Sequence, residues 1–231
     1  MNAETVSVRP NSLLLYDVSR GLAYDKPRWR GWMHLVCFEA ALVLGTIIVM
    51  TARAGWQTVD AAVYGGAVAG LFGTSALYHR GQWTAKTSAR LQRADHVMIV
   101  LLIAGSATTP MQVCLPGVWK AIGLIGLWSL ALAAIALRLL WMDAPERLVG
   151  AIYVGLGWVA GSAIPVVWIK AGVTPAVLLL CGGLLYTAGA IGYHRRRPDP
   201  RPLVFGYHEV FHSYVTAAAI CQYVAIAVFL L

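Results

Sequence analysis

Charged residues are scarce in this chain of 231 residues: Asp, Glu, Lys and Arg together make up 12% of it, whereas hydrophobic residues make up 59%. Soluble domains contain about 25% charged and about 45 to 50% apolar residues, so the composition excludes an ordinary soluble fold. The mean hydropathy of +0.67 points the same way. We therefore predict an integral membrane protein.

Paired cysteines are also absent. The four cysteines lie far apart within apolar runs and form no C-x-x-C pair, which excludes a thiolate metal site of that kind and gives no basis for a disulfide framework. We expect them to be small core residues: Cys37, Cys114, Cys181 and Cys221.

A third absence concerns the N-terminal segment. Residues 1–31 contain no apolar h-region and no cleavage site, so a signal peptide is not predicted there. We expect residues 1–31 to be a polar cytoplasmic arm and residues 32–231 to form a single transmembrane domain. The charged residues of the arm include Arg9, Asp17, Arg20, Asp25, Lys26, Arg28 and Arg30.

Long apolar runs are abundant. A bilayer core about 30 Å thick requires roughly 20 residues of helix, and seven stretches reach that length. The sequence therefore predicts an all-α bundle of seven transmembrane helices, with glycines that allow close helix packing and kinks near Pro110 and Pro165. The expected spans are 32–52, 58–79, 95–114, 119–141, 147–169, 174–194 and 206–231.

The basic residues predict the orientation of the bundle. Of the 18 Lys and Arg residues, all except Arg53, Lys120 and Lys170 fall on the same side as the N-terminus. The positive-inside rule then places the N-terminus in the cytoplasm and the C-terminus outside. Because the charges lie in short clusters between apolar runs, we expect contact with the anionic inner leaflet of the cell membrane and no binding of nucleic acid.

All six histidines fall on this same side in the predicted bundle. His34 opens the first span, His79 closes the second, His96 opens the third, His194 closes the sixth, and His208 and His212 open the seventh. The amphipathic character of histidine explains a position at either interface, but it does not explain six at one interface.

The stretch "YHEVFH" contains the H-E-x-x-H spacing, which puts His208 and His212 on one helical face. Ser75 and His79 have the same separation in the second span. Asp95 begins the third span, where a carboxylate that enters the bilayer needs a partner. Three neutral imidazoles and one carboxylate at similar depth are typical of a zinc site with an open position that activates water.

Each of these residues also has a simpler interpretation. The histidine pair could form an interfacial hydrogen bond, and His79 alone would be structural. Ser75 would pack a helix interface or bond to its own backbone, and Asp95 would cap the third helix. His96 points about 100° away from Asp95 around the helix, so we favour Asp95 as the residue that faces a shared site.

The sequence resembles the hemolysin III family, and through it the adiponectin and progestin receptors and the alkaline ceramidase-like membrane hydrolases. Three blocks carry the resemblance: "GTSALYHR", "RLQRADHVMIVLLIAGSATTP" and "FGYHEVFHSYV". The resemblance implies seven helices with a cytoplasmic N-terminus, zinc bound by His79, His208 and His212, Asp95 beside the zinc-bound water, and Ser75 nearby. The sequence departs from the family pattern at Ala107 and Thr108, which alters the expected lining of the site.

Three functions follow from these residues. We expect a zinc-dependent hydrolase of lipid amide or ester bonds, in which Asp95 takes the proton of the water and Ser75 donates to the oxyanion. The alternative is a receptor-like sensor or structural protein in which zinc only joins two helices. The third is an intramembrane zinc protease with Glu209 as the base, since Glu209 lies within the H-E-x-x-H spacing.

One acidic residue stands apart from this site. Glu39 lies within the first predicted span, where a buried carboxylate is costly without a partner. We expect a hydrogen-bonded structural acid there.

Overall fold

The computed structural model describes residues 14–17, 22–141 and 143–231. Within them, seven segments are long and apolar enough to cross a membrane, the fifth of them formed by two consecutive helices. The predicted seven-helix bundle is thus confirmed. The helices are α1 (Trp32–Thr51), α2 (Trp56–Arg80), α3 (Ala85–Cys114), α4 (Gly117–Leu140), α5 (Glu146–Gly161), α6 (Ile164–Ala171), α7 (Val173–Arg195) and α8 (Tyr207–Phe229).

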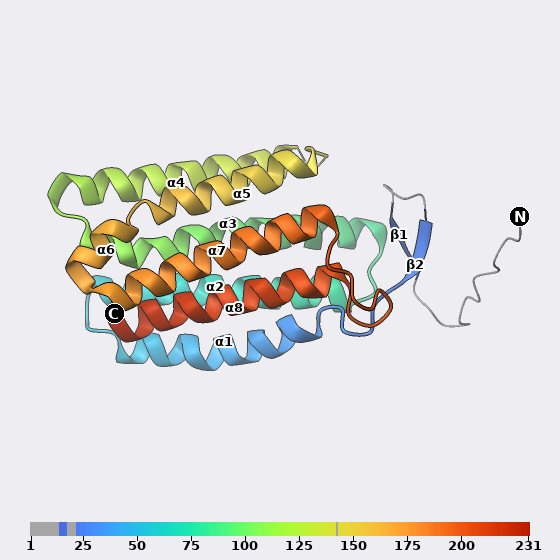
Figure 1. The fold of residues 1–231 in the computed structure, drawn as a ribbon, viewed down its shortest axis with the longest axis horizontal. Helices are drawn as coiled ribbons and strands as arrows, with labels where there is room; N and C mark the ends of the chain where they lie inside the picture. The colour runs from blue at the N-terminus through green and yellow to red at the C-terminus, as the bar shows by residue number, and fades with distance from the viewer. Residues whose placement is uncertain (1–13, 18–21, 142) are drawn as a thin grey trace, which may run out of the picture.

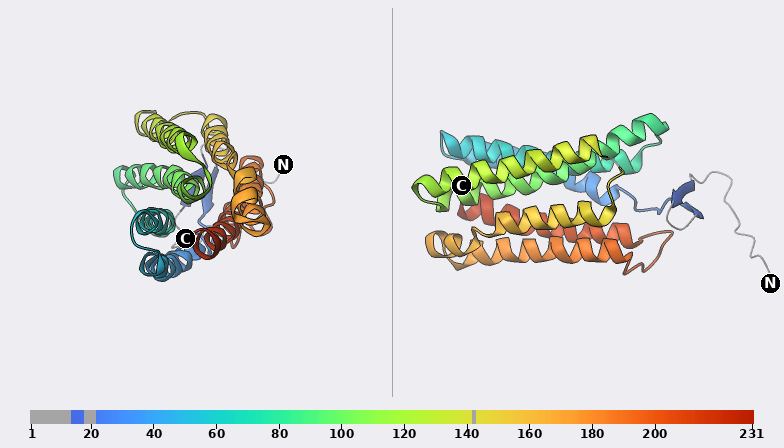
Figure 2. Two further views of the ribbon diagram at one scale, coloured as in Figure 1. Left: turned by 90° about the vertical axis from the view of Figure 1, so that its left-hand side faces the viewer. Right: turned by 90° about the horizontal axis from the view of Figure 1, so that it is seen from above.

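The long helices lie side by side with their axes roughly aligned (Figure 1). Seen end-on, they follow one another around a ring (Figure 2). Helix α8 closes this ring because it packs along α7 and also contacts α1 and α3. The first helix and the last helix are therefore neighbours, although they are far apart in the sequence.

A short hairpin precedes the bundle. Strand β1 (Leu14–Asp17) pairs with β2 (Leu22–Asp25) in antiparallel register, with Leu14 opposite Asp25. The chain then joins the bundle through two backbone hydrogen bonds, from the amide of Arg28 to the carbonyl of Leu203 and from the amide of Trp29 to the carbonyl of Val204. The last residues of the arm, just before α1, are thus attached to the connection between α7 and α8.

Helix α3 begins ten residues earlier than the predicted third span, at Ala85 instead of residue 95. The additional turns are polar, so they do not count towards a hydrophobic span, but nothing in them breaks a helix. The side chain of Thr84 caps the helix by accepting a hydrogen bond from the amide of Thr87. The alternative in which Asp95 is the helix cap is therefore wrong, and Asp95 lies about three turns inside α3.

The fifth span is interrupted. Helix α5 ends at Gly161, and α6 begins at Ile164 with Pro165 in its first turn. Proline has no amide hydrogen to donate, so a continuous helix would lose a hydrogen bond there. The break agrees with the kink predicted near Pro165, whereas α3 continues through Pro110 to Cys114.

Two expectations of burial are wrong. Glu39 is exposed on the outer face of α1, and Cys181 is exposed on α7. All four cysteines are free thiols, as expected. Hydropathy places both residues within a span, but it does not say which face of the helix they occupy.

Glycines bring α1 and α2 close together. A Cβ atom added at Gly65 would lie 3.2 Å from the Cα of Gly45, whereas one added at Gly66 would meet nothing within 4 Å. Small residues allow this approach because helices in lipid associate through packing.

Gly65→Val should therefore lower the stability of the bundle by about 1 to 3 kcal/mol because it overpacks this contact. Thermal unfolding of the purified protein in detergent measures the effect. Gly66→Val is the matched control and should leave the midpoint close to that of the original chain. Equal midpoints for the two variants would contradict the close α1–α2 contact.

Candidate metal centre

Three histidines from two helices meet at the end of the bundle next to the arm. His79 is the next-to-last residue of α2, and His208 and His212 lie in the first turns of α8. One ring nitrogen from each lies within 4.8 Å of the other two. The spacing of four residues on α8 explains why both of its imidazoles point towards α2.

The donor atoms fit a divalent transition metal. The Nε2 atoms of His79 and His208 are 3.3 Å apart. Two imidazole nitrogens bound to one tetrahedral zinc ion at about 2.0 to 2.1 Å are about 3.3 to 3.4 Å apart. A direct N–H···N hydrogen bond between the two rings would also give this distance, but it would not account for the approach of His212. Three imidazoles suit zinc and leave a fourth position for water or substrate.

Asp95 and Ser75 lie side by side near this cluster. Both are buried, with 8% and 2% of their surface exposed, and the hydroxyl of Ser75 donates a hydrogen bond to the Asp95 carboxyl. Both residues line the same cavity as His212. The structure therefore brings the predicted carboxylate and serine to a common space with one of the three histidines.

This cavity is largely apolar. Its volume is about 190 Å³. From Asp95 it extends between α3, α5 and α7 to the break between α5 and α6, where Ala163 and Ile164 form its wall. Two of its lining residues, Trp158 and Leu180, are also exposed on the outer surface, so the cavity reaches towards the lipid-facing side between α5 and α7.

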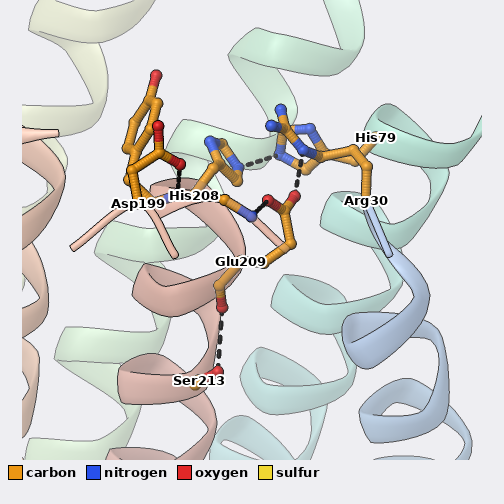
Figure 3. A network of polar contacts seen from close by, with 8 residues as sticks. Arg30, His79, Asp199, His208, Glu209 and Ser213 are labelled. Atoms are coloured by element: carbon orange, nitrogen blue, oxygen red, sulfur yellow. Dashed lines mark hydrogen bonds and ion pairs between the residues drawn. The ribbon is translucent and has the colours of Figure 1, made fainter. Parts of the chain in front are cut away.

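Figure 3 shows the carboxylate of Glu209 joined to Arg30, whereas the imidazoles of His79 and His208 contact each other. One carboxylate oxygen of Glu209 forms an ion pair with the guanidinium of Arg30, and the other accepts a hydrogen bond of 2.9 Å from the amide of Gly206. The second contact satisfies an amide at the start of α8. Glu209 is 1% exposed, so this carboxylate connects the arm to the helix that carries His208 and His212.

Positive charges crowd the rim beside the three histidines. Burial lowers the pKa of Lys26, and the nearby charges of Arg30 and Arg80 lower it further. The ammonium of Lys26 donates to the carbonyl of Gly81 at 3.5 Å, and the Arg80 guanidinium lies 3.5 Å from the centre of the Trp32 ring. Glu209 is therefore important for charge balance, because it offers Arg30 a carboxylate in this cationic environment.

Two other histidines occupy different surroundings. His96 faces the buried Arg138 of α4, whose guanidinium contacts its Nδ1 atom, while the neighbouring Asp95 faces the cavity, as the 100° separation predicts. His96 was expected to open a span, but it lies well inside α3 because of the longer N-terminal part of this helix. His194 is exposed near the end of α7.

Three buried polar residues at this end of the bundle were not assigned a role from sequence. Arg30 and Arg138 counted only towards the charge of the cytoplasmic side, yet both are buried, with 9% and 4% exposure. His34 received no role beyond its depth, yet its ring stacks on that of His212 at 3.7 Å between centroids. The sequence feature that could have indicated a buried role for His34 is its position as an isolated polar residue at the start of an apolar run, "WMHLV".

Arg30 and Glu209 should each stabilise the fold only while the other is present, because each compensates the buried charge of its partner. Removal of one buried partner leaves an uncompensated charge and typically costs about 3 to 5 kcal/mol. Arg30→Met and Glu209→Gln should each lower the unfolding midpoint in detergent, and the double variant should lose less than the sum of the two. Strictly additive losses would show that the two side chains do not interact.

The comparisons with known proteins agree with this architecture. The chain is similar to the "Hemolysin-3 homolog" of Bacillus subtilis (strain 168), with 27% identity over 183 residues that cover 79% of this chain and 83% of that protein. It is also similar to "Hemolysin-3" of Bacillus cereus, with 27% identity over 139 residues that cover 59% of this chain and 60% of that protein. The family described as "Haemolysin-III related" matches residues 22–223. With this match over most of its length, the chain belongs to the haemolysin-III related family of multi-pass membrane proteins.

Proposed function

We propose that this protein is a zinc-dependent hydrolase that cleaves an amide or ester bond of a membrane lipid. One observation carries the proposal: a largely apolar cavity inside a membrane bundle has Asp95, Ser75 and His212 on its wall, and His212 is one of three histidines whose nitrogens lie within 4.8 Å of one another. The same cavity thus offers an apolar wall for a lipid chain and polar side chains suited to hydrolysis.

His79, His208 and His212 would hold the metal. A bound zinc ion supplies Lewis acidity, which activates water and polarises a carbonyl group. The histidines themselves need to be neutral to act as ligands, and burial at this end of the bundle favours neutral rings. His212 is 3% exposed, which is consistent with that requirement.

Asp95 would take the proton from the attacking water as general base. Its carboxyl is oriented by the hydroxyl of Ser75, so we assign Ser75 first to the positioning of Asp95. The oxyanion role considered for Ser75 would require the hydroxyl to leave Asp95. The apolar wall excludes bulk water, which strengthens electrostatic interactions in the cavity.

The shape of the cavity favours a lipid over a water-soluble substrate. Glycines on α5 and α7, among them Gly157 and Gly183, line the cavity where it approaches the lipid-facing surface. Trp158 donates a hydrogen bond to Thr187 across this pair of helices at 3.2 Å. An acyl chain that enters from the bilayer would therefore move from one apolar environment to another, with its polar end at Asp95.

A structural metal is the second candidate, and helix packing supports it. Helix α2 packs along α1 and α3, and α8 packs along α7, so a metal bound by His79 and His208 would join two helices that have little backbone contact of their own. Metal binding of this kind contributes directly to folding. In this case Asp95 would have no chemical role.

The protease hypothesis has less support. Both oxygens of Glu209 are engaged, one by Arg30 and one by the amide of Gly206. A general base must reach the water that it deprotonates. We therefore propose a structural role for Glu209 in place of the catalytic one considered from the H-E-x-x-H spacing.

For the cellular setting we propose the cell membrane, with the arm in the cytoplasm. The basis is the distribution of Lys and Arg together with the helix ends: α1, α3, α5 and α8 begin at the end of the bundle next to the arm (Figure 1). The membrane lipid is the only partner that we propose.

Metal analysis is the first test of the site. The purified protein should contain about one zinc ion per chain, and His79→Ala and His208→Ala should lose most of it because three ligands are needed to hold the ion. Mass spectrometry of the elements in the protein measures this content. His194→Ala is the matched control, and its metal content should equal that of the original chain. Full metal content in both ligand variants would refute the site.

Hydrolysis of a long-chain N-acylsphingosine by the zinc-loaded protein is the test of function. Asp95→Asn should slow turnover by at least about 100-fold because it removes a general base, while zinc content stays unchanged. Asp60→Asn is the matched control: Asp60 is also a buried acid, with 6% exposure, but it lies near the opposite end of α2. Undiminished turnover by Asp95→Asn would contradict the mechanism. A chelator that lowers the unfolding midpoint, with no hydrolysis by any variant, would favour the structural metal.

A further inference from the structure

His34 is a buried polar side chain without an evident partner. It is 3% exposed, and neither Nδ1 nor Nε2 has a hydrogen-bond partner among the residues that the structure describes. A buried polar group without a partner typically costs about 1 to 3 kcal/mol, so such groups in native proteins usually serve a ligand, a water or a reaction.

The position of the His34 ring is well defined. It stacks on the ring of His212, with 3.7 Å between centroids and 12° between planes, and it meets the ring of Phe72 edge-on at 5.0 Å. Gly31 precedes α1 in the left-handed region at a φ of 77°, where an added Cβ atom would lie 3.1 Å from the Cβ of His79. The start of α1 is therefore held close against the end of α2, and His34 is fixed with it.

The contacts of His34 separate it from the metal ligands. Among the described residues, the three histidines whose donor nitrogens lie within 4.8 Å of one another are His79, His208 and His212. His34 meets His212 face to face, and this contact leaves the nitrogens at the ring edge free for another group.

The cavity is where such a group would bind. His34 lines it together with Ser75, Asp95 and His212, so its ring stands where the polar end of a bound lipid would lie. Because Asp95 is an acceptor when ionised, the carbonyl oxygen of such a lipid needs a donor from elsewhere in the wall.

Three other donors on the wall of the cavity are already engaged. The hydroxyl of Ser75 donates to Asp95, that of Ser106 donates to the carbonyl of Ile103, and that of Tyr153 is directed at the carbonyl of His96. His34 and Tyr186 both line the cavity with a donor group that has no partner among the described residues. Of the two, His34 is the one whose ring stacks on His212, and it therefore lies beside the three histidines.

We infer that His34 is a substrate-binding residue, whose ring N–H donates a hydrogen bond to the carbonyl or carboxylate oxygen of a long-chain acyl ligand in the cavity. The assignment rests on the proposed function for the class of ligand, but not for turnover. A neutral imidazole carries one such donor in either tautomer. The stack on His212 keeps the ring at the correct place, so the hydrogen bond costs little ordering of the side chain when the ligand arrives.

Equilibrium binding of radiolabelled palmitate to the purified protein in detergent tests this inference, with and without EDTA. His34→Phe preserves the aromatic stack but removes the donor, and it should weaken palmitate binding by about tenfold. His34→Gln supplies an amide N–H in a similar place and should restore most of the affinity. His194→Phe is the matched control, because it makes the same substitution at an exposed histidine.

The outcomes are distinct. Loss of zinc from His34→Phe would assign His34 to the metal site and overturn the inference, as would unchanged palmitate affinity in this variant. An effect that disappears after EDTA treatment would show that His34 acts only through the metal, again against the inference. Equal weakening in His34→Gln and His34→Phe would show that a replacement N–H does not restore binding, which would also overturn the inference.

The experiment also separates this inference from the proposed function. Palmitate is a product-like ligand that undergoes no reaction, so a His34-dependent affinity stands even if the protein hydrolyses no lipid. Conversely, the protein could hydrolyse lipid with zinc while substitution of His34 leaves the palmitate affinity unchanged. That result would support the proposed function and contradict the role of His34 in ligand binding.

Discussion

The concentration of imidazole at one end of an apolar bundle is the constraint on which the rest of the structure depends. His34, His79, His208 and His212 form one continuous set of ring contacts, and lipid offers none of them a hydrogen bond. Their nitrogens therefore need partners within the bundle. The proposed ion, shared by three rings, and the proposed ligand, held by the fourth, would meet this need.

Several features keep this end of the bundle closed and correctly aligned. The α8 helix supplies two of the rings, and its first turn is fixed by Glu209, which joins the amide of Gly206 to the side chain of Arg30. Arg30 in turn lies directly before α1, which carries His34. The arm is thus part of the site's support, because it connects the beginnings of the first and last helices around the ring.

The sequence alone predicted most of the fold, and for clear reasons. Helices in a membrane satisfy their own backbone, so long apolar runs define seven spans without knowledge of their packing, and the alternation of helix direction brings six histidines to one end. Hydropathy does not detect the part of a helix that continues beyond the apolar span as a polar segment. For this reason the predicted start of α3 lies ten residues after its actual start, and the sequence places Asp95 at the beginning of a span although it lies inside the helix.

The candidate site was predictable as far as helical periodicity reaches. The spacing of His208 and His212 is local, so their shared direction follows from the sequence. The partners of Glu209, the burial of Arg138 and the stack of His34 on His212 depend on which helices become neighbours. A single sequence does not contain that information, because a lone charge near a helix end has the same pattern whether it faces water or another helix.

The interruption of the fifth span has a consequence for the depth of the cavity. The chain turns between Gly161 and Ile164, and residues on both sides of the turn contribute to the wall, so this irregular piece of backbone forms the floor opposite Asp95. Under the proposed function, the distance between this floor and the carboxylate of Asp95 would set the length of the acyl chain that the cavity accepts. A break one turn earlier or later in this span would then fit a shorter or longer chain, with the residues proposed for hydrolysis unchanged.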